Sequence, residues 1–282
     1  MAEALSKAAL ITGCSSGIGH ETAARLASSG WTVYATARSA DTIADLADRG
    51  CRTMALDVLD EGSMRAAVQQ VEREEGAVGV LVNNAGYGQS GAVEAVPIDL
   101  VRRNFETNVF GYLRMAQLVL PGMRRQGWGR IVNLSSVAGR VTMPGSGIYS
   151  STKFAIRAMT DALRFEVRGF GVDVVLVEPG PIRTRFTESA NSGMPDGSAA
   201  DGTYAAYHET VAKADADADR STLLAGDPED VAKVIERAIS SRRPRARYRV
   251  TIPSRLLPAL RGALPDRAFD AFLRTQAAPP GG

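Results

Sequence analysis

The stretch that decides the fold is Ala8-Ala9-Leu10-Ile11-Thr12-Gly13-Cys14-Ser15-Ser16-Gly17-Ile18-Gly19. Its first residues form an apolar run that predicts a short buried strand, and the residues after Gly17 have the apolar spacing of a helix. Glycines between a strand and a helix let the chain turn sharply and let its backbone approach a pyrophosphate, which the free amides of the helix N-terminus then bind. The loop therefore predicts a dinucleotide-binding turn, although its spacing, G-x-x-x-G-x-G, differs from G-x-G-x-x-G.

Short apolar runs alternate with helical patterns along most of the chain. The expected strands are 8–12, 32–37, 52–56, 78–82, 130–134, 172–177 and 248–252. The expected helices are 18–29, 41–49, 61–74, 99–126, 149–170, 227–241 and 263–274. Such alternation indicates a parallel sheet that is covered on both faces. We therefore expect an α/β fold, a Rossmann-like doubly wound parallel sheet of about seven strands in a three-layer α/β/α sandwich.

Composition excludes several classes of protein. The net charge of +2 gives no global attraction to nucleic acid or to an anionic membrane. Two cysteines, Cys14 and Cys51, make no disulfide framework and fit a reducing cytoplasm. Because the histidines are only His20 and His208, we expect no metal site. The N-terminus lacks the pattern of a secretion signal, and no run of about 18 apolar residues predicts a membrane span.

A tyrosine and a lysine stand four residues apart in the helix expected over 149–170. Tyr149 and Lys153 therefore share one helical face, where an ammonium group is expected to lower the pKa of the phenol. Ser136 lies thirteen residues upstream at the end of a strand, where its hydroxyl can hold a substrate oxygen while the phenol moves a proton. Its neighbour Ser135 is the alternative, since side chains alternate along a strand and only one of the two can face the site. The three residues Ser136, Tyr149 and Lys153 are the expected catalytic groups.

The end of the second strand bears on the choice of cofactor. An acidic residue is expected there when a ribose 2′-hydroxyl must be held, but this chain has Arg38. A guanidinium binds a phosphate through two hydrogen bonds, so the position favours the 2′-phosphate. We expect NADP(H) as the cofactor, with NAD(H) as the alternative.

Taken together, the motifs resemble the short-chain dehydrogenase/reductase family. The resemblance covers residues 8–184, and its motifs are the glycine loop, Asn83-Asn84-Ala85-Gly86, Asn108, Ser136, Tyr149-x-x-x-Lys153 and Pro179-Gly180. It implies that Asn108 orders a water near Lys153 and that Lys153 also bonds the nicotinamide ribose. The cofactor-binding residues that the loop and the resemblance together imply are Thr12, Gly13, Ser15, Ser16, Gly17, Ile18, Gly19, Arg38, Asp57, Val58, Asn83, Ala85, Gly86, Tyr149, Lys153, Pro179, Gly180, Ile182 and Thr184.

The resemblance also implies an enzyme that moves a hydride between nicotinamide and an alcohol or ketone. The expected substrate is hydrophobic, because the segments beside the motifs are mainly apolar. Residues 33–38 and the long C-terminal part are also similar to members that act on steroids, retinoids or other lipids, so a substrate of this kind is what the resemblance implies. Alternatives are a sugar-nucleotide epimerase or dehydratase and a non-catalytic NADP-binding regulator. The residues expected to line the substrate pocket are Tyr87, Gln89, Val137, Met143, Gly145 and Phe186.

The organisation of the chain follows from the same reasoning. We expect residues 1–282 to form one dinucleotide-binding catalytic domain, with a substrate loop or lid over 185–225, a substrate and packing region over 226–276 and a disordered tail over 277–282. Residues 191–225 show little apolar periodicity and are interpreted as a mobile loop, short helices or plain surface disorder. The arginines of 237–261 are interpreted as a solvated face rather than a membrane contact. The helices over 99–126 and 149–170 pair subunits in the family, so a homodimer or homotetramer is expected.

Overall fold

The computed structural model describes residues 5–194, 202–221 and 224–280. Its sheet has seven strands in the order β3-β2-β1-β4-β5-β6-β7, and every neighbouring pair is parallel. The strands are β1 (Ala9–Ile11), β2 (Val33–Ala37), β3 (Arg52–Ala55), β4 (Val80–Asn83), β5 (Gly129–Leu134), β6 (Val172–Pro179) and β7 (Arg247–Val250). The predicted fold class, a doubly wound parallel sheet, is confirmed.

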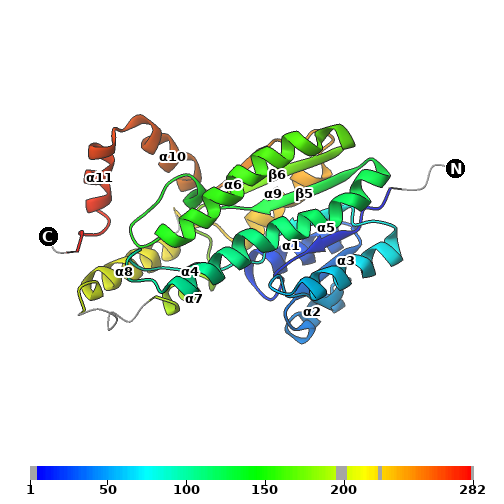
Figure 1. Ribbon diagram of the computed structural model, residues 1–282, viewed down its shortest axis with the longest axis horizontal. Helices are drawn as coiled ribbons and strands as arrows, with labels where there is room; N and C mark the ends of the chain where they lie inside the picture. The colour runs from blue at the N-terminus through cyan, green and yellow to red at the C-terminus, as the bar shows by residue number, and fades with distance from the viewer. Residues whose placement is uncertain (1–4, 195–201, 222–223, 281–282) are drawn as a thin grey trace.

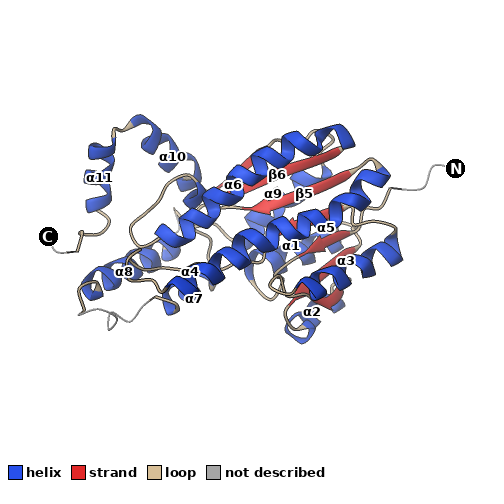
Figure 2. Cartoon of the chain, in the orientation of Figure 1, coloured by secondary structure: helices blue, strands red, loops and turns tan. Residues whose placement is uncertain are grey.

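Helices cover both faces of this sheet, which gives three layers (Figures 1 and 2). One apolar cluster joins the sheet to α1 (Gly17–Ser28), α2 (Ala44–Asp48) and α9 (Pro228–Ser240). A second cluster, on the other face, joins it to α3 (Glu61–Glu75), α5 (Gly111–Gln126) and α6 (Gly147–Val167). The central strands are buried on both faces, which explains why their sequences are almost continuously apolar.

The strand order reverses direction beside β1. Ala9 of β1 lies opposite Val33 of β2 on one side and opposite Val80 of β4 on the other. The chain therefore winds outward in two directions from β1, and a crevice opens where the connections after β1 and β4 diverge. The glycine loop leaves β1 at this point and leads directly into α1.

The helix expected over 99–126 is interrupted. It consists of α4 (Ile98–Phe105), a π-helical turn η2 (Glu106–Phe110) and α5. Turns of this kind often lie at functional sites, because the extra residue redirects side chains. Asn108 lies in this turn and is fully buried.

Residues 191–225 were expected to form a loop or short helices, but they contain a longer helix. After α7 (Phe186–Ser192), the described part includes α8 (Ala205–Arg220), which is 16 residues long. Alanine supplies strong helix propensity here without the apolar bulk that periodicity detects. Contacts of Tyr207 Oη with the Gly145 amide (2.6 Å) and of His208 Nε2 with the Ala92 amide (3.0 Å) then fix the helix on its neighbours. Residues 195–201 and 222–223 of the expected loop lie outside the described residues.

The C-terminal part also holds one helix more than expected. The helix predicted over 263–274 begins at Asp266 as α11 (Asp266–Arg274), and α10 (Pro253–Ala263) precedes it. Pro265 separates them, because proline at this point cannot continue α10. In the tail expected to be disordered, Ala277 is buried, while 281–282 lie outside the described residues.

Short 3₁₀ turns η1 (Ala40–Ile43), η3 (Val137–Gly139) and η4 (Arg168–Phe170) lie between the longer elements. In the described parts of the chain, no helix has the length and apolar character needed to cross a bilayer.

Candidate active site

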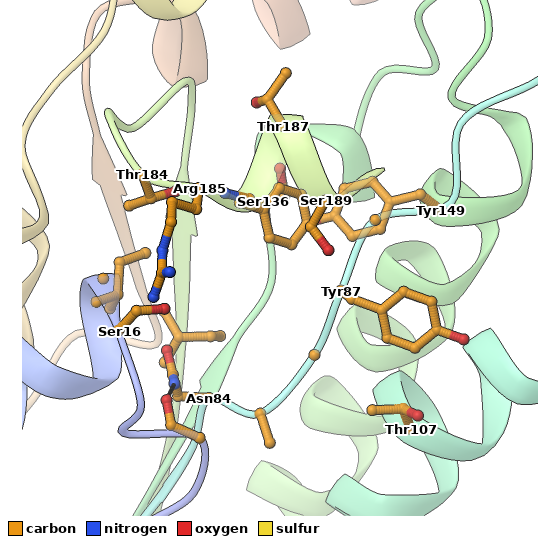
Figure 3. Close-up of a pocket in the computed structure, with 18 of the residues that line it drawn as sticks. Ser16, Asn84, Tyr87, Thr107, Ser136, Tyr149, Thr184, Arg185, Thr187 and Ser189 are labelled. Carbon is orange, nitrogen blue, oxygen red and sulfur yellow. Dashed lines mark hydrogen bonds between the residues drawn. The ribbon is translucent and has the colours of Figure 1, made fainter. Parts of the chain in front are cut away.

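The crevice beside β1 belongs to a cavity of about 1080 Å³ at the carboxyl ends of the strands (Figure 3). Expected site residues that line this cavity are Gly13, Ser15, Ser16, Gly17, Ile18, Arg38, Asp57, Val58, Ala85, Gly86, Tyr87, Gln89, Ser136, Val137, Tyr149, Lys153, Pro179, Gly180, Ile182, Thr184 and Phe186. Expected site residues that do not line it are Thr12, Gly19, Asn83, Asn108, Met143 and Gly145. The expected cofactor, catalytic and substrate residues are thus brought mostly to one place.

The glycine loop has no space for side chains. A Cβ at Gly19 would lie 2.3 Å from the Gly13 oxygen and 2.4 Å from Asn84 Nδ2. A Cβ at Gly13 would lie 2.7 Å from the Ala85 Cα, and Gly13 has a φ of +74°. The loop backbone is therefore pressed against the segment after β4, and it presents the N-terminus of α1 to the cavity.

Buried polar groups hold this contact together. Thr12 Oγ1 accepts the backbone amides of Asn84 and Ala85, both at 3.0 Å. Asn84 Nδ2 donates to the carbonyls of Thr12 and Gly13, both at 2.9 Å. Thr12 is fully buried, so its side chain shapes the loop and does not reach the cavity.

Asn83 differs from its expected position. Its side chain is buried and donates to Asn133 Oδ1 (2.9 Å) and to the Tyr112 carbonyl (3.1 Å). Asn84 lines the cavity in its place. Because side chains alternate along a strand, neighbouring asparagines at a strand end point to opposite sides, and this signal would have found Asn84.

Tyr149 and Ser136 meet at one end of the cavity (Figure 3). Tyr149 lies in the first turn of α6 and Ser136 directly follows β5, and a hydrogen bond joins their side chains. Burial raises the pKa of Tyr149 above its ordinary value, whereas the Ser136 hydrogen bond acts to lower it. Ser135 is buried and donates instead to the Lys153 carbonyl at 3.3 Å, so Ser136 is the serine whose hydroxyl meets the phenol.

Lys153 lies one turn after Tyr149 on the same face of α6. Its Nζ donates to the Leu134 carbonyl at 2.9 Å and stands 5.6 Å from the centre of the Tyr149 ring. Burial lowers the pKa of Lys153 to about 7. The pKa of Tyr149 is set in this structure by burial and by Ser136, and the expected lowering by Lys153 stays a prediction.

Asn108 holds the loop after β4 from behind the cavity. Its Oδ1 accepts the Tyr87 amide at 3.0 Å, and its Nδ2 donates to the Tyr87 carbonyl at 2.9 Å and to Thr152 Oγ1 at 3.2 Å. The π-helical turn η2 thereby links the Tyr87 backbone to α6, next to Lys153. A Cβ at Gly86 would lie 2.8 Å from Asn108 Oδ1, so this approach depends on glycine.

Two residues expected in the substrate pocket do not line the main cavity. Met143 lines a smaller adjoining cavity of about 170 Å³, which it shares with Val137, Tyr149 and Phe186. Gly145 is buried under α8, where its would-be Cβ meets Val211 Cγ1 at 2.5 Å. The expectation for Gly145 is corrected, because it was made without α8.

Several cavity residues were not expected from the sequence. Figure 3 shows Thr107 near Tyr87, and Thr187 and Ser189 near Tyr149. These side chains come from η2 and α7, and their direction depends on how the helices pack, which no sequence pattern showed. Cavity residues that sequence reasoning missed include Asn84, Arg103, Thr107, Arg185, Thr187, Glu188, Ser189, Ser192 and Asp215.

Comparison with known proteins identifies the family of the chain. A family model described as short chain dehydrogenase matches residues 7–195. Human 17-beta-hydroxysteroid dehydrogenase type 1 is 37% identical over 269 residues, which cover 91% of this chain and 80% of that protein. The NADPH-dependent 3-dehydrocapnine reductase of Ornithobacterium rhinotracheale is 34% identical over 271 residues, covering 93% and 94%.

A solved structure extends the likeness to the whole fold. The crystal structure of a short-chain dehydrogenase from Streptomyces avermitilis matches with a TM-score of 0.79 and 31% identity, over 98% of this chain and 99% of that one. The family model covers well over half of the chain, and the relatives align along nearly all of it. This chain therefore belongs to the short-chain dehydrogenase/reductase family and is an oxidoreductase.

Proposed function

We propose that the protein is an NADP(H)-dependent oxidoreductase that moves a hydride between nicotinamide and a hydrophobic secondary alcohol or ketone. The observation that carries the proposal is the single cavity in which Tyr149, Ser136 and Lys153 face the glycine loop. A catalytic triad beside a diphosphate-binding turn is what such a reaction requires of the protein.

The residues at the glycine loop fit a dinucleotide. The loop leaves no room for a Cβ at Gly13 or Gly19, so its backbone amides can approach a diphosphate closely. Arg38 is exposed at the cavity wall after β2, where it would bind the 2′-phosphate. Asp57 and Val58 line the same cavity and would hold the adenine. The NADPH dependence named for the Ornithobacterium relative supports NADP(H) over NAD(H).

The far side of the dinucleotide would meet the segments after β4 and β6. Ala85 and Gly86 would pack under the ribose, and the segment from Pro179 to Thr184 would hold the nicotinamide carboxamide. We assign Thr12, Gly19 and Asn83 an indirect part in binding, since their side chains or backbone shape the loops that touch the cofactor.

The chemistry assigned to the chain is proton transfer and positioning. NADPH supplies the hydride, and the carbonyl oxygen of the substrate then needs a proton, which Tyr149 donates. Ser136 donates a hydrogen bond to the same oxygen and fixes its distance from Tyr149. Lys153 would bond the nicotinamide ribose, and Asn108 would order a water through which protons could reach Lys153. In the oxidative direction Tyr149 takes the proton from the alcohol.

The pKa shifts of this pair bear on such a division of work. Burial keeps the Tyr149 phenol protonated, so the proton needed in reduction is present, but the raised pKa also makes the phenol a weaker acid, which the bound cofactor would have to offset. Lys153, with a pKa of about 7, can gain or lose a proton near neutral pH. Oxidation needs the phenolate, which the positive charge of the oxidised nicotinamide would favour.

The apolar side of the cavity supports a hydrophobic substrate. Phe186 packs against Tyr149 with ring centres 5.3 Å apart, and Val137 lies in both the main and the adjoining cavity. The steroid activity named for the human relative is compatible with these walls. The segment 185–225 would form one side of the pocket, since Asp215 and Ala218 of α8 reach it.

An oligomer is supported by the outer faces of α5 and α6. Leu113 is 37% exposed, Phe154 40% and Phe165 86%, which is much apolar surface for two neighbouring helices. We infer a homodimer or homotetramer that buries this face.

Both cysteines are free and buried, in agreement with a cytoplasmic enzyme.

The test is a turnover assay. The protein is mixed with NADPH and a panel of ketones that includes steroids, long-chain β-keto compounds, retinal and small polar sugars, and the reduced nicotinamide absorbance is followed. We expect oxidation with hydrophobic ketones, and NADH to be used less well. Binding of NADPH without turnover across the panel would contradict the proposal and favour a non-catalytic role.

A further inference from the structure

Two arginines in the segment after β6 have very different surroundings. Arg183 pairs with Asp227 through Nε at 2.8 Å and Nη2 at 2.7 Å, and its Nη1 donates to the Ala225 carbonyl at 3.0 Å. Arg185 is exposed and lines the cavity, and its guanidinium has no hydrogen bond or ion pair with any residue among 5–194, 202–221 and 224–280. The first arginine anchors the segment to α9, whereas the second remains available to a ligand.

The Arg185 guanidinium is directed at the glycine loop. Figure 3 shows the Arg185 side chain extending from beside Thr184 toward Ser16. Thr184 itself packs on the loop, since a Cβ at Gly17 would lie 3.1 Å from Thr184 Cγ2. Arg185 therefore faces the start of α1 from the opposite side of the cavity.

The start of α1 has the features of an anion site. Ser16 occupies its N-cap position without a side-chain capping bond, and the first turn contains no acidic residue. The first amides of α1 and its positive dipole end are thus open to an anion, and the guanidinium of Arg185 adds a full charge to the same place.

Phe186 connects this contact to the catalytic end of the cavity. The Phe186 amide donates to Thr184 Oγ1 at 3.2 Å, and its ring lies 5.3 Å from that of Tyr149. Three consecutive residues thus have different contacts. Thr184 touches the glycine loop, Arg185 faces the start of α1, and Phe186 packs against Tyr149. Anything that fixes Arg185 also fixes Phe186 and the start of α7.

We propose that Arg185 binds the diphosphate of the dinucleotide from the side opposite the glycine loop, and that this contact holds α7 so that Phe186 packs on Tyr149. The inference rests on the proposed dinucleotide-dependent function. It separates two arginines by role: Arg38 binds the 2′-phosphate, which only NADP(H) has, whereas Arg185 binds the diphosphate that NADP(H) and NAD(H) share.

The first test measures dissociation constants for NADP⁺, NAD⁺ and adenosine 2′-monophosphate by calorimetry. Arg185→Ala should weaken both dinucleotides by the same factor, about 10-fold or more, because a charge-assisted bond is lost. It should leave adenosine 2′-monophosphate unchanged, since that nucleotide has no diphosphate. Arg38→Ala should weaken NADP⁺ and adenosine 2′-monophosphate but not NAD⁺.

Arg183→Ala is the matched control, because it removes a guanidinium from the same segment outside the cavity. Its dinucleotide affinities should stay within about twofold of those of the unaltered protein. An equal loss in Arg183→Ala and Arg185→Ala would overturn the inference, since the effect would then come from the anchoring of the segment. A loss confined to NADP⁺, or none, would overturn it too. An unaltered protein that binds neither dinucleotide would overturn the proposed function itself.

Hydrogen exchange tests the link to α7. Saturating NADP⁺ should slow exchange of the amides of 186–192 in the unaltered protein, and should slow it much less in Arg185→Ala at equal saturation. Lysine at position 185 should restore part of both the affinity and the protection. Equal protection of α7 in the unaltered protein and in Arg185→Ala would show that Arg185 does not hold the helix.

Discussion

The two walls of the cavity are built differently. The wall expected to hold the nucleotide consists of backbone at strand ends, fixed by buried bonds such as those of Thr12 Oγ1 to Asn84 and Ala85. The wall expected to hold the substrate consists of side chains on α7 and α8, among them Phe186, which is 36% exposed. The difference teaches that one wall has its shape fixed by packed backbone, whereas the shape of the other depends on side chains that can be exchanged.

The largest effect on cofactor binding is expected from a methyl group in the glycine loop. Gly19→Ala places a Cβ against the Gly13 oxygen and Asn84 Nδ2, so the loop must move away from β4. We expect the dissociation constant for NADP⁺ to rise roughly 10–100-fold, which corresponds to about 1.4–2.8 kcal/mol. Calorimetry of NADP⁺ binding measures this change.

Gly262→Ala is the control for this substitution. Gly262 also lies within a helix, α10, and nothing stands within 4 Å of its would-be Cβ. NADP⁺ affinity should stay unchanged, and the free energy of unfolding should rise by about 0.5–1 kcal/mol because alanine favours a helix. Equal NADP⁺ affinities of the two variants would mean that the loop is not sterically fixed.

A smaller effect is expected on the substrate wall. Phe186→Ala removes a half-buried ring beside Tyr149, which should raise KM for a hydrophobic ketone about 5-fold. The NADP⁺ dissociation constant should change by less than about twofold, because Arg185 and the glycine loop are untouched. Steady-state kinetics and calorimetry check both values, and a comparable loss of cofactor affinity would contradict the division of the cavity into two walls.

A last effect concerns folding rather than binding, namely the pH dependence of the free energy of unfolding. Burial lowers the pKa of Lys153 from its ordinary 10.5 to about 7, so between these values the unfolded chain binds a proton that the folded chain has released. The free energy of unfolding should therefore rise with pH in this window, by at most about 1.4 kcal/mol per pH unit, and should show no such dependence below pH 7.

Lys153→Met should lack this contribution. Urea unfolding of both proteins from pH 6 to 10 gives the difference in their free energies of unfolding at each pH. Above pH 7 the free energy of unfolding of the unaltered protein should rise steadily relative to that of Lys153→Met. Parallel curves throughout would show that the Lys153 pKa is not lowered in the folded chain.

The sequence predicts the nucleotide wall much better than the substrate wall. Apolar runs placed every strand within a few residues, and the glycine spacing located the turn after β1. Asn83 was expected at the cofactor, but Asn84 lines the cavity, because motif matching ignored the alternation of side chains. Gly145 was expected in the pocket, but α8 covers it, and this helix is too rich in alanine to show apolar periodicity.

Residues such as Arg185 were missed for a different physical reason. Arg183 and Arg185 look alike in the sequence, and only the position of Asp227 at the start of α9 decides which guanidinium is paired. The number of helices after β7 was also underestimated, since Pro265 separates α10 from α11. Contacts between segments far apart in the sequence decide these cases.

The central claim is that Tyr149 transfers the proton in a reaction whose cofactor is held by the opposite wall. Tyr149→Phe tests it most directly, with kcat for a ketone substrate and the dissociation constant for NADPH measured on the same preparation. We predict that kcat falls by about 10²–10⁴-fold while NADPH binding stays within about twofold. A kcat near that of the unaltered enzyme would contradict the account.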